Sequence, residues 1–413
     1  MPRAGHHVAE MVLGRLLGPR FHYCEYYTIR NCCRQIPCAR MPEHEAAQAL
    51  VFMQKSHDHD LTDPVSPDFD GLMIQVREPV ARALSNYELD LETVGPPHSA
   101  EYMRFWLGLE AAYTVGFIEK WCASPDPRAL ILKYEDLLGE PVAYYQSIFR
   151  RFALPEQLFD PEKVVAARSV SSADKRPFRE RDIRTSAHYD PDSLADFQRL
   201  VARSATILGY QPHPELTRAS TAARSRAVGL AFEARQRVMQ RRLPEALAVL
   251  DSYLALPDSH VLARRMKANL LLAMGNAAAA EAELQTVTAT EPGHPRAWIE
   301  MAELQRRRGE TEAARATLDA CLARARDPAR ASEAILAAFS DPALTEGALA
   351  LAPPPALTRE DVVAAFRFIL GRTPEDESVI ESHQRVESAE ALREILLRSP
   401  EFAEKYRRIA GGA

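Results

Sequence analysis

The stretch Gly71-Leu72-Met73-Ile74-Gln75-Val76-Arg77-Glu78-Pro79, which runs on to Ser85, decides how the first half of the chain folds. An apolar run of strand type ends in an arginine, and a serine follows eight residues later inside what reads as the next helix. We therefore expect Arg77 at the carboxyl end of a strand and Ser85 about two turns into a helix, where both can grip one phosphate. This layout is typical of an enzyme that handles a phosphorylated nucleotide.

The first residues of the chain, Pro2-Arg3-Ala4-Gly5-His6-His7, provide a second candidate anion site. A glycine-containing turn that opens a helix, expected over residues 8–17, presents backbone N–H groups and a positive dipole end. Arg3 adds a full charge, and the side chains of His6 and His7 can donate hydrogen bonds. Alone the signal is weak, because a glycine before a helix often marks only a turn.

The triplet Lys55-Ser56-His57 follows the apolar run 49–53, for which we predict a strand. A cation and a possible base then stand at the end of a strand, where α/β folds place their sites. Histidine accepts a proton near neutral pH, and lysine stabilises a developing oxyanion. The alternative is a solvated strand exit. Asp58 and Asp60 either orient His57 or face water.

Taken in order, these segments resemble the sulfotransferases that use 3′-phosphoadenosine 5′-phosphosulfate. The loop of residues 2–7 is similar to their 5′-phosphosulfate loop, and Lys55-Ser56-His57 to the segment whose histidine is the catalytic base. Arg77 and Ser85 match the pair that binds the 3′-phosphate of the donor. Lys133-Tyr134-Glu135-Asp136-Leu137 matches the end of a later strand. The resemblance covers about residues 1–210.

The resemblance implies an in-line displacement at sulfur. His57 would take the proton of an acceptor hydroxyl, while Lys55 and Arg3 would stabilise charge on the sulfuryl group. The other residues implied in binding the donor are Gly5, His6 and His7 at the 5′-phosphate, Arg77 and Ser85 at the 3′-phosphate, and Arg176 and Arg179 in a basic stretch that reads equally well as a solvated charge cluster. No metal is implied, and the acceptor is expected to be a hydroxylated compound, a saccharide or glycan by analogy.

The chain departs from the family pattern in its first residues. Arg3 stands where lysine is usual and cannot donate a proton to the leaving group, and Ala4 replaces a serine. The family's first strand precedes the loop, whereas this sequence starts at Met1, so we expect a parallel sheet that lacks a central strand. The expectation is a protein that starts upstream, or a truncated and inactive form. The alternative function is a scaffold that acts through its other domains.

Composition restricts the remaining classes of protein to which the chain can belong. The chain has 413 residues, a formal net charge of −6, and hydrophobic and charged shares of 46% and 26%, as in a globular protein of several domains. These values give no sign of nucleic-acid binding, and neither a transmembrane run nor a signal peptide is predicted. The expected compartment is the cytoplasm. A nucleotide kinase is disfavoured because the Walker lysine is missing.

The six cysteines favour reduced thiols over a metal site. Four of them lie between Cys24 and Cys38, yet the paired spacing of a zinc site is absent. The segment from His22 to Cys38 is expected either to line the acceptor side or to serve in packing. No metal ligand is therefore assigned.

A period of 34 residues organises the middle of the chain. Three columns of small or apolar residues recur, and Gly275 and Gly309 follow the same spacing, with Arg241 in the first unit. This resembles the tetratricopeptide repeat, a stack of paired helices that commonly binds a partner protein. The columns are Ala234, Ala268 and Ala302; Ala246, Ala280 and Ala314; and Leu250, Leu284 and Leu318. The alternative is an irregular alanine-rich bundle.

The last segment is expected to be a small helical domain. Thr358-Arg359-Glu360-Asp361 is a capping-type start, followed by an apolar helix over residues 362–370. The segment resembles a helical domain that recurs in bacterial surface and glycan-related proteins, which suggests interaction. The predicted organisation is an α/β, P-loop-type parallel-sheet domain (1–215), helical repeats (222–345), a proline-rich linker (346–356) and this helical domain (357–413).

Overall fold

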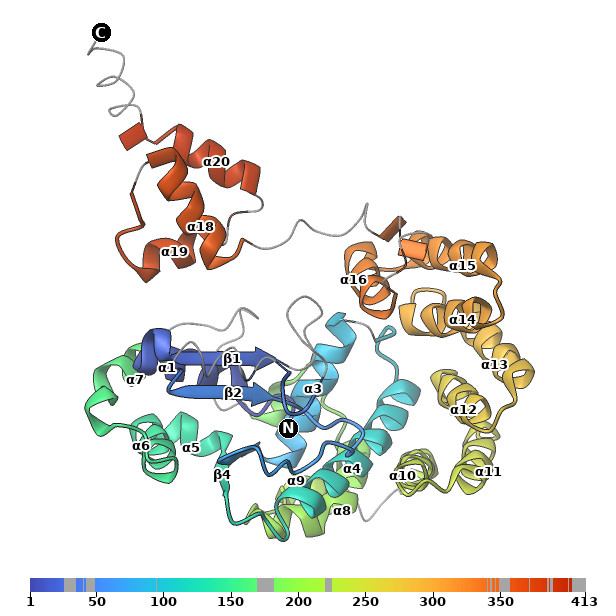
Figure 1. The fold of residues 1–413 in the computed structure, drawn as a ribbon. Coiled ribbons are helices and arrows are strands. Elements are labelled where there is room, and N and C mark those ends of the chain that lie inside the picture. The colour runs from blue at the N-terminus through green and yellow to red at the C-terminus, as the bar shows by residue number, and fades with distance from the viewer. Residues whose placement is uncertain are drawn as a thin grey trace.

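The computed structural model places strands and helices first, helical hairpins next, and a small helical unit last (Figure 1). It describes residues 1–25, 35–39, 41, 49–93, 95–168, 182–219, 225–339, 341, 344–345, 347–348, 357–370, 372–384, 386, 389–399 and 401–402. Within the described residues, none of the helices has both the length and the apolar character that crossing a membrane requires.

The strands form two parallel pairs. β1 (Phe21–Glu25) pairs with β2 (Val51–Lys55), and β3 (Leu72–Val76) pairs with β4 (Ala129–Lys133). The predicted runs at 72–76 and 129–133 are confirmed, whereas the run at 49–53 is shifted by two residues. Lys55 is therefore the last residue of a strand and is buried.

β1 includes the start of the segment from His22 to Cys38, for which the sequence left the acceptor side or packing open. Cys24 and Cys38 are buried, which agrees with packing at these two positions, and residues 26–34 lie outside the described residues. Phe21 lies opposite Val51, and Glu25 lies opposite Lys55. The five residues lack a clear two-residue alternation, so periodicity alone did not indicate a strand.

The expected single sheet is divided into two in the described part of the chain. Residues of both β2 and β3 line a cavity of about 460 Å³, and no pairing joins these two strands. The amino group of Met1 is buried and donates a hydrogen bond to the carbonyl of Gln75 at 3.0 Å, and burial lowers the pKa of this amino group to about 5.

Helices surround the two strand pairs. α1 supplies apolar residues such as Val12 and Leu16 to a core that also contains Ile148 and Phe149 from α6. The helices of this part are α1 (His6–Leu17), η1 (Gly18–Arg20), α3 (Pro79–Thr93), α4 (Ala100–Trp121), α5 (Tyr134–Gly139), α6 (Pro141–Arg151), η2 (Glu156–Leu158), α7 (Pro161–Arg168), η3 (Ile183–Thr185), α8 (Pro191–Ile207) and α9 (Pro214–Ala219).

Paired helices form the middle of the chain and curve away from α4 (Figure 1). All nine residues of the three predicted columns are buried, with at most 1% of their surface exposed. They fill the contacts between neighbouring helices, which explains why only alanine and leucine occur there. The helices are α10 (Arg226–Met239), α11 (Leu243–Leu254), α12 (Leu262–Ala273), α13 (Ala277–Thr290), α14 (Pro295–Arg307), α15 (Thr311–Arg324) and α16 (Pro328–Ala338).

The turn within each helical pair uses a left-handed residue. Gly275 and Gly309 have φ of 82° and 80°, and Arg241, at the same position of the first pair, has φ of 61°. Glycine adopts this conformation without steric cost, whereas a residue with a side chain does not. The period of 34 residues is therefore a repeated backbone conformation as well as a packing pattern.

The last part is a separate small core. Thr358 and Asp361 form the predicted capping box, and Val362 and Phe366 are buried with Ile380, Leu392 and their neighbours. The predicted helix at 362–370 is divided: α18 (Arg359–Ala365) continues as the π-helical turn η4 (Phe366–Leu370), and α19 (Glu377–Gln384) and α20 (Ala389–Leu397) follow.

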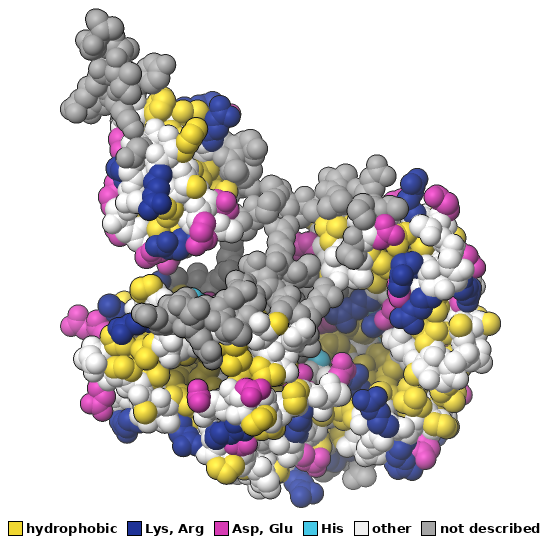
Figure 2. All heavy atoms as spheres, in the orientation of Figure 1, with side chains coloured by type: hydrophobic (Ala, Val, Ile, Leu, Met, Phe, Trp, Pro, Cys, Tyr) yellow, Lys and Arg dark blue, Asp and Glu magenta, His cyan; other side chains and the backbone are white. Residues whose placement is uncertain are grey.

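The first and middle parts share one hydrophobic core through α4 and α10. Gly108 of α4 faces the backbone of α10, and a Cβ atom built on it would lie 2.5 Å from the carbonyl oxygen of Val228 and 2.6 Å from the Cβ of Ala231. The two helices approach this closely only because residue 108 has no side chain. The visible surface between the two parts is hollowed, with Lys and Arg side chains on the repeat side (Figure 2).

We predict that Gly108→Ala destabilises the protein by about 1–3 kcal/mol, because the added methyl group forces α4 and α10 apart. The matched control is Gly229→Ala in α10, where an added Cβ meets no atom within 4 Å. That substitution is expected to stabilise the protein by about 0.5–1 kcal/mol through helix propensity. Urea unfolding measures both; equal effects of the two substitutions would contradict the close approach.

Candidate functional site

Three of the predicted motifs meet at the carboxyl ends of β2 and β3. The Nε atom of Arg3 donates a hydrogen bond to the hydroxyl of Ser85 at 3.2 Å, and an Nη atom of Arg77 lies 3.4 Å from the carbonyl oxygen of Arg3. Ser85 lies inside α3, two turns after Pro79, as the sequence indicated. Arg3, Arg77 and Ser85, which lie up to 82 positions apart in the chain, thus form one cationic corner.

Arg77 is a buried cation in this corner. It is 8% exposed, and its guanidinium lies 4.5 Å from the centre of the Tyr134 ring. Burial lowers the pKa of Arg77, although Tyr134 and Glu135 oppose the shift, and an arginine stays charged at any working pH. Within the described residues Arg77 forms no ion pair with a carboxylate. A buried positive charge of this kind attracts an anion.

The loop before α1 is held in a constrained conformation. Arg3 and Gly5 have φ of 60° and 90°, so both lie in the left-handed region. A Cβ on Gly5 would lie 3.0 Å from the ring of Tyr134, so glycine is required on two grounds. The helix then begins at His6, and within the described residues no side chain caps its first N–H groups, which suits an anionic ligand.

Histidine rings gather beside this loop. The centroid of the His6 ring lies 4.9 Å from that of His57 and 4.0 Å from that of His7. Both ring nitrogens of His6 are buried without a hydrogen-bond partner in the described part of the chain. Lys55, which is 9% exposed, ends the strand next to them. His6 therefore offers a ring nitrogen to a ligand.

His57 is an uncharged imidazole in this site. Burial lowers its pKa most strongly, and the positive charges of the Met1 amino group and of Lys55 lower it further. The pKa of His6 is lowered in the same way, by burial first and then by Lys55. A neutral imidazole is the form that can accept a proton. Anions bound beside Lys55 would raise the pKa of His57.

Asp58 anchors the loop after β2 to α4. Its buried carboxylate accepts hydrogen bonds from the Nζ of Lys120 at 2.6 Å and the Nε1 of Trp121 at 2.8 Å. The hydroxyl of Tyr113 donates to the carbonyl of His57 at 2.6 Å. Of the two roles considered for Asp58, neither is observed: its carboxylate is committed to α4 rather than to His57 or to water.

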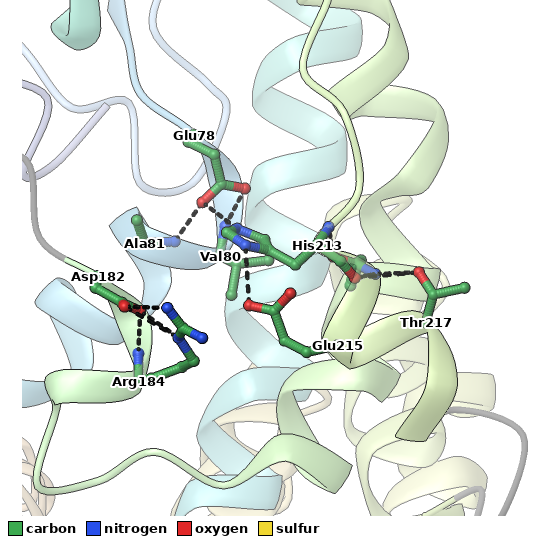
Figure 3. A network of polar contacts seen from close by, with 9 residues as sticks. Glu78, Val80, Ala81, Asp182, Arg184, His213, Glu215 and Thr217 are labelled. Atoms are coloured by element: carbon green, nitrogen blue, oxygen red, sulfur yellow. Dashed lines mark hydrogen bonds and ion pairs between the residues drawn. The ribbon is translucent and has the colours of Figure 1, made fainter.

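A second polar network surrounds Glu78, the residue after Arg77 (Figure 3). The carboxylate of Glu78 accepts hydrogen bonds from the N–H groups of Val80 at 3.0 Å and Ala81 at 2.6 Å, and it lies 3.2 Å from the Nε2 of His213. This contact with Glu78 raises the pKa of His213. Glu135 accepts from the Glu78 N–H at 2.9 Å. The network fixes the start of α3, which carries Ser85.

Arg82, one turn before Ser85, is not among the residues predicted from the sequence. Arg82 is fully buried, and it pairs with Glu110 of α4 and donates a hydrogen bond to the hydroxyl of Thr114 at 2.7 Å. Its Nε and one Nη atom have no hydrogen-bond partner in the described residues. An arginine in an amphipathic helix usually faces solvent, so the pattern carried no signal for it.

Two predicted residues are not placed. Arg176 and Arg179 fall in 169–181, outside the described residues. Among the residues that the structure describes, no group of three or more His, Cys, Asp or Glu side chains is arranged to hold a metal ion. The described site therefore consists of Arg3, Gly5, His6, His7, Lys55, His57, Arg77 and Ser85.

Comparison with known proteins identifies part of the chain. Residues 271–338 match the family model of the tetratricopeptide repeat. This range runs from α12 to α16, and the match confirms the predicted repeat over these residues. No curated protein matches the chain.

Proposed function

We propose that the protein is a sulfotransferase that moves a sulfuryl group from 3′-phosphoadenosine 5′-phosphosulfate to an acceptor hydroxyl. The observation that carries the proposal is the meeting of the three motifs: Arg3 contacts both Ser85 and Arg77, while His6 lies beside His57. The donor carries one anionic group on the 3′ oxygen of its ribose, a phosphate, and another on the 5′ oxygen, the phosphosulfate. Arg77 and Ser85 suit the 3′-phosphate, and Arg3 with the start of α1 suits the 5′-phosphosulfate.

The proposed reaction is one displacement. The acceptor oxygen attacks sulfur and its proton passes to the imidazole of His57, while the bond between sulfur and the bridging oxygen of the 5′-phosphate breaks. The products are the sulfated acceptor and adenosine 3′,5′-bisphosphate. Lys55 and Arg3 stabilise the charge that develops on the sulfuryl and leaving oxygens. Arg3 acts through its charge alone, since it cannot act as an acid.

The acceptor in this proposal is a hydroxylated compound, and a saccharide or glycan is the first class to test. The cytoplasm is the proposed compartment. Support comes from the free, buried thiols of Cys122 and Cys321, which suit a reducing environment. Burial raises the pKa of both thiols, so they are protonated and take no part in the proposed chemistry.

A second function is favoured by the repeat match at residues 271–338. Stacked helical pairs of this kind present a concave surface that commonly binds a protein partner. In this alternative the first part of the chain is an inactive support for the repeats. The two functions differ in one property: only the transferase needs a donor site.

The test is transfer of labelled sulfate from the donor to a panel of glycans and small hydroxylated compounds. The proposal expects label on at least one acceptor with release of adenosine 3′,5′-bisphosphate in equal amount. Label on no acceptor, together with a wild-type chain that fails to bind the bisphosphate, would favour the scaffold. Label on a phenolic or peptide hydroxyl alone would retain the transferase and overturn the saccharide assignment.

A further inference from the structure

The loop that carries His57 is strained and needs support from outside. Asp58 and Leu61 have φ of 46° and 57°, in the left-handed region that residues with side chains rarely adopt. Such conformations persist only where neighbouring structure holds them. The position of the His57 ring therefore depends on the contacts that fix residues 57–63.

One set of supports comes from α4. The Nζ of Lys120 donates to the carboxylate of Asp58 at 2.6 Å, to the carbonyl of Leu61 at 3.1 Å and to the carbonyl of Asp63 at 2.7 Å. Tyr113 holds the carbonyl of His57 from the same helix. These contacts fix one side of the loop.

The other support comes from α10, the first helix after the strand-bearing part. An Nη atom of Arg235 donates to the carbonyl of His59 at 2.9 Å and to a carboxylate oxygen of Asp60 at 3.3 Å. The side chain of Leu61 lies against Gly116 of α4. A Cβ atom built on Gly116 would lie 2.3 Å from the side chain of Leu61 and 3.5 Å from the methyl group of Met239. The loop thus contacts both α4 and the end of α10.

We propose that Arg235 is a positioning residue for His57, so that the first helix of the helical region is part of the support of the active site. The inference rests on the proposed function for its kinetic consequence, but not for its structural one. Arg235 reaches the backbone two residues after His57 and the side chain of Asp60, while Tyr113 of α4 holds the carbonyl of His57. Removing the side chain deletes the contacts of α10 with His59 and Asp60.

The test compares Arg235→Ala and Arg235→Lys with Arg237→Ala in the full chain. Arg237 lies on the same helix and, among the described residues, forms an ion pair with Glu233 alone, at 3.0 Å, so it is the matched control. For Arg235→Ala we expect kcat to fall about 10- to 100-fold, since a shift of about 1 Å in a catalytic group has effects of this size. KM for the donor should stay unchanged, Arg235→Lys should recover part of kcat, and Arg237→Ala should match wild type.

A second readout separates this inference from the proposed function. The ring signals of His57 in a proton NMR spectrum, assigned by their loss in His57→Ala, should shift in Arg235→Ala and not in Arg237→Ala. This holds even if the wild-type chain transfers no sulfuryl group. Unchanged ring signals in a folded Arg235→Ala would overturn the positioning role. So would shifts of the same size in both variants, since these would indicate a general effect of helix α10.

Discussion

His57→Ala is expected to lower sulfuryl transfer by about 10²- to 10⁴-fold, the usual effect of losing a general base. The reason lies in the site: His57 is the half-buried, neutral imidazole next to His6 and Lys55. Without it, the acceptor hydroxyl must attack while still protonated or lose its proton to water. The initial rate of label transfer at saturating donor measures the effect.

Nucleotide binding is the internal control for this substitution. The corner of Arg3, Arg77 and Ser85 is built on other elements, so affinity for adenosine 3′,5′-bisphosphate should remain within about twofold of wild type. His383→Ala, in the small carboxy-terminal unit, is the matched histidine control and should transfer at the wild-type rate. A His57→Ala variant that transfers normally would remove His57 from the mechanism and leave His6 as the nearest imidazole.

Arg82→Ala is expected to destabilise the protein by about 3–5 kcal/mol, measured by urea unfolding. Arg82 is fully buried, and its partner Glu110 is 9% exposed, so the substitution leaves a buried carboxylate without its cation. It also removes the hydrogen bond to Thr114, which links α3 to α4. Because α3 carries Ser85, the loss of stability should come with weaker nucleotide binding.

A double variant tests the cause of this loss. Replacing the pair together, Arg82→Met with Glu110→Leu, removes both charges and should recover most of the lost stability, because a buried ion pair is often replaceable by apolar residues. If instead the double variant is as unstable as Arg82→Ala, the cavity rather than the unpaired charge is responsible. A loss below about 1 kcal/mol in the single variant would contradict the burial of the pair.

Local sequence patterns correctly predicted those strands and helices whose apolar residues follow one another in a simple run or a regular period. The apolar runs at 72–76 and 129–133 are β3 and β4, and the 34-residue columns identify helical pairs whose column residues are all buried. β1 was missed because Phe21–Glu25 mixes aromatic, polar and charged residues. The division of the strands into two pairs depends on what lies between β2 and β3, which local periodicity does not report.

The site residues that could be predicted from the sequence are those close to the end of a strand or the start of a helix. Arg77 and Ser85 come together because the helix that follows a parallel strand begins at the carboxyl end of that strand, and Arg3 contacts both. The supports were not predictable: Arg82, Arg235 and Lys120 act through contacts between helices far apart in the sequence. For Asp58, sequence proximity to His57 suggested a catalytic partner, whereas packing directs its carboxylate to α4.

The most direct test of the central claim is calorimetric titration of the full chain with adenosine 3′,5′-bisphosphate. The account predicts binding by wild type, about 100-fold weaker binding by Arg77→Ala, and weaker binding of adenosine 5′-phosphate, which lacks the 3′-phosphate. The control is Arg15→Ala, on the α1 helix outside the corner. Equal affinity of wild type and Arg77→Ala, or no preference for the bisphosphate, would contradict the account.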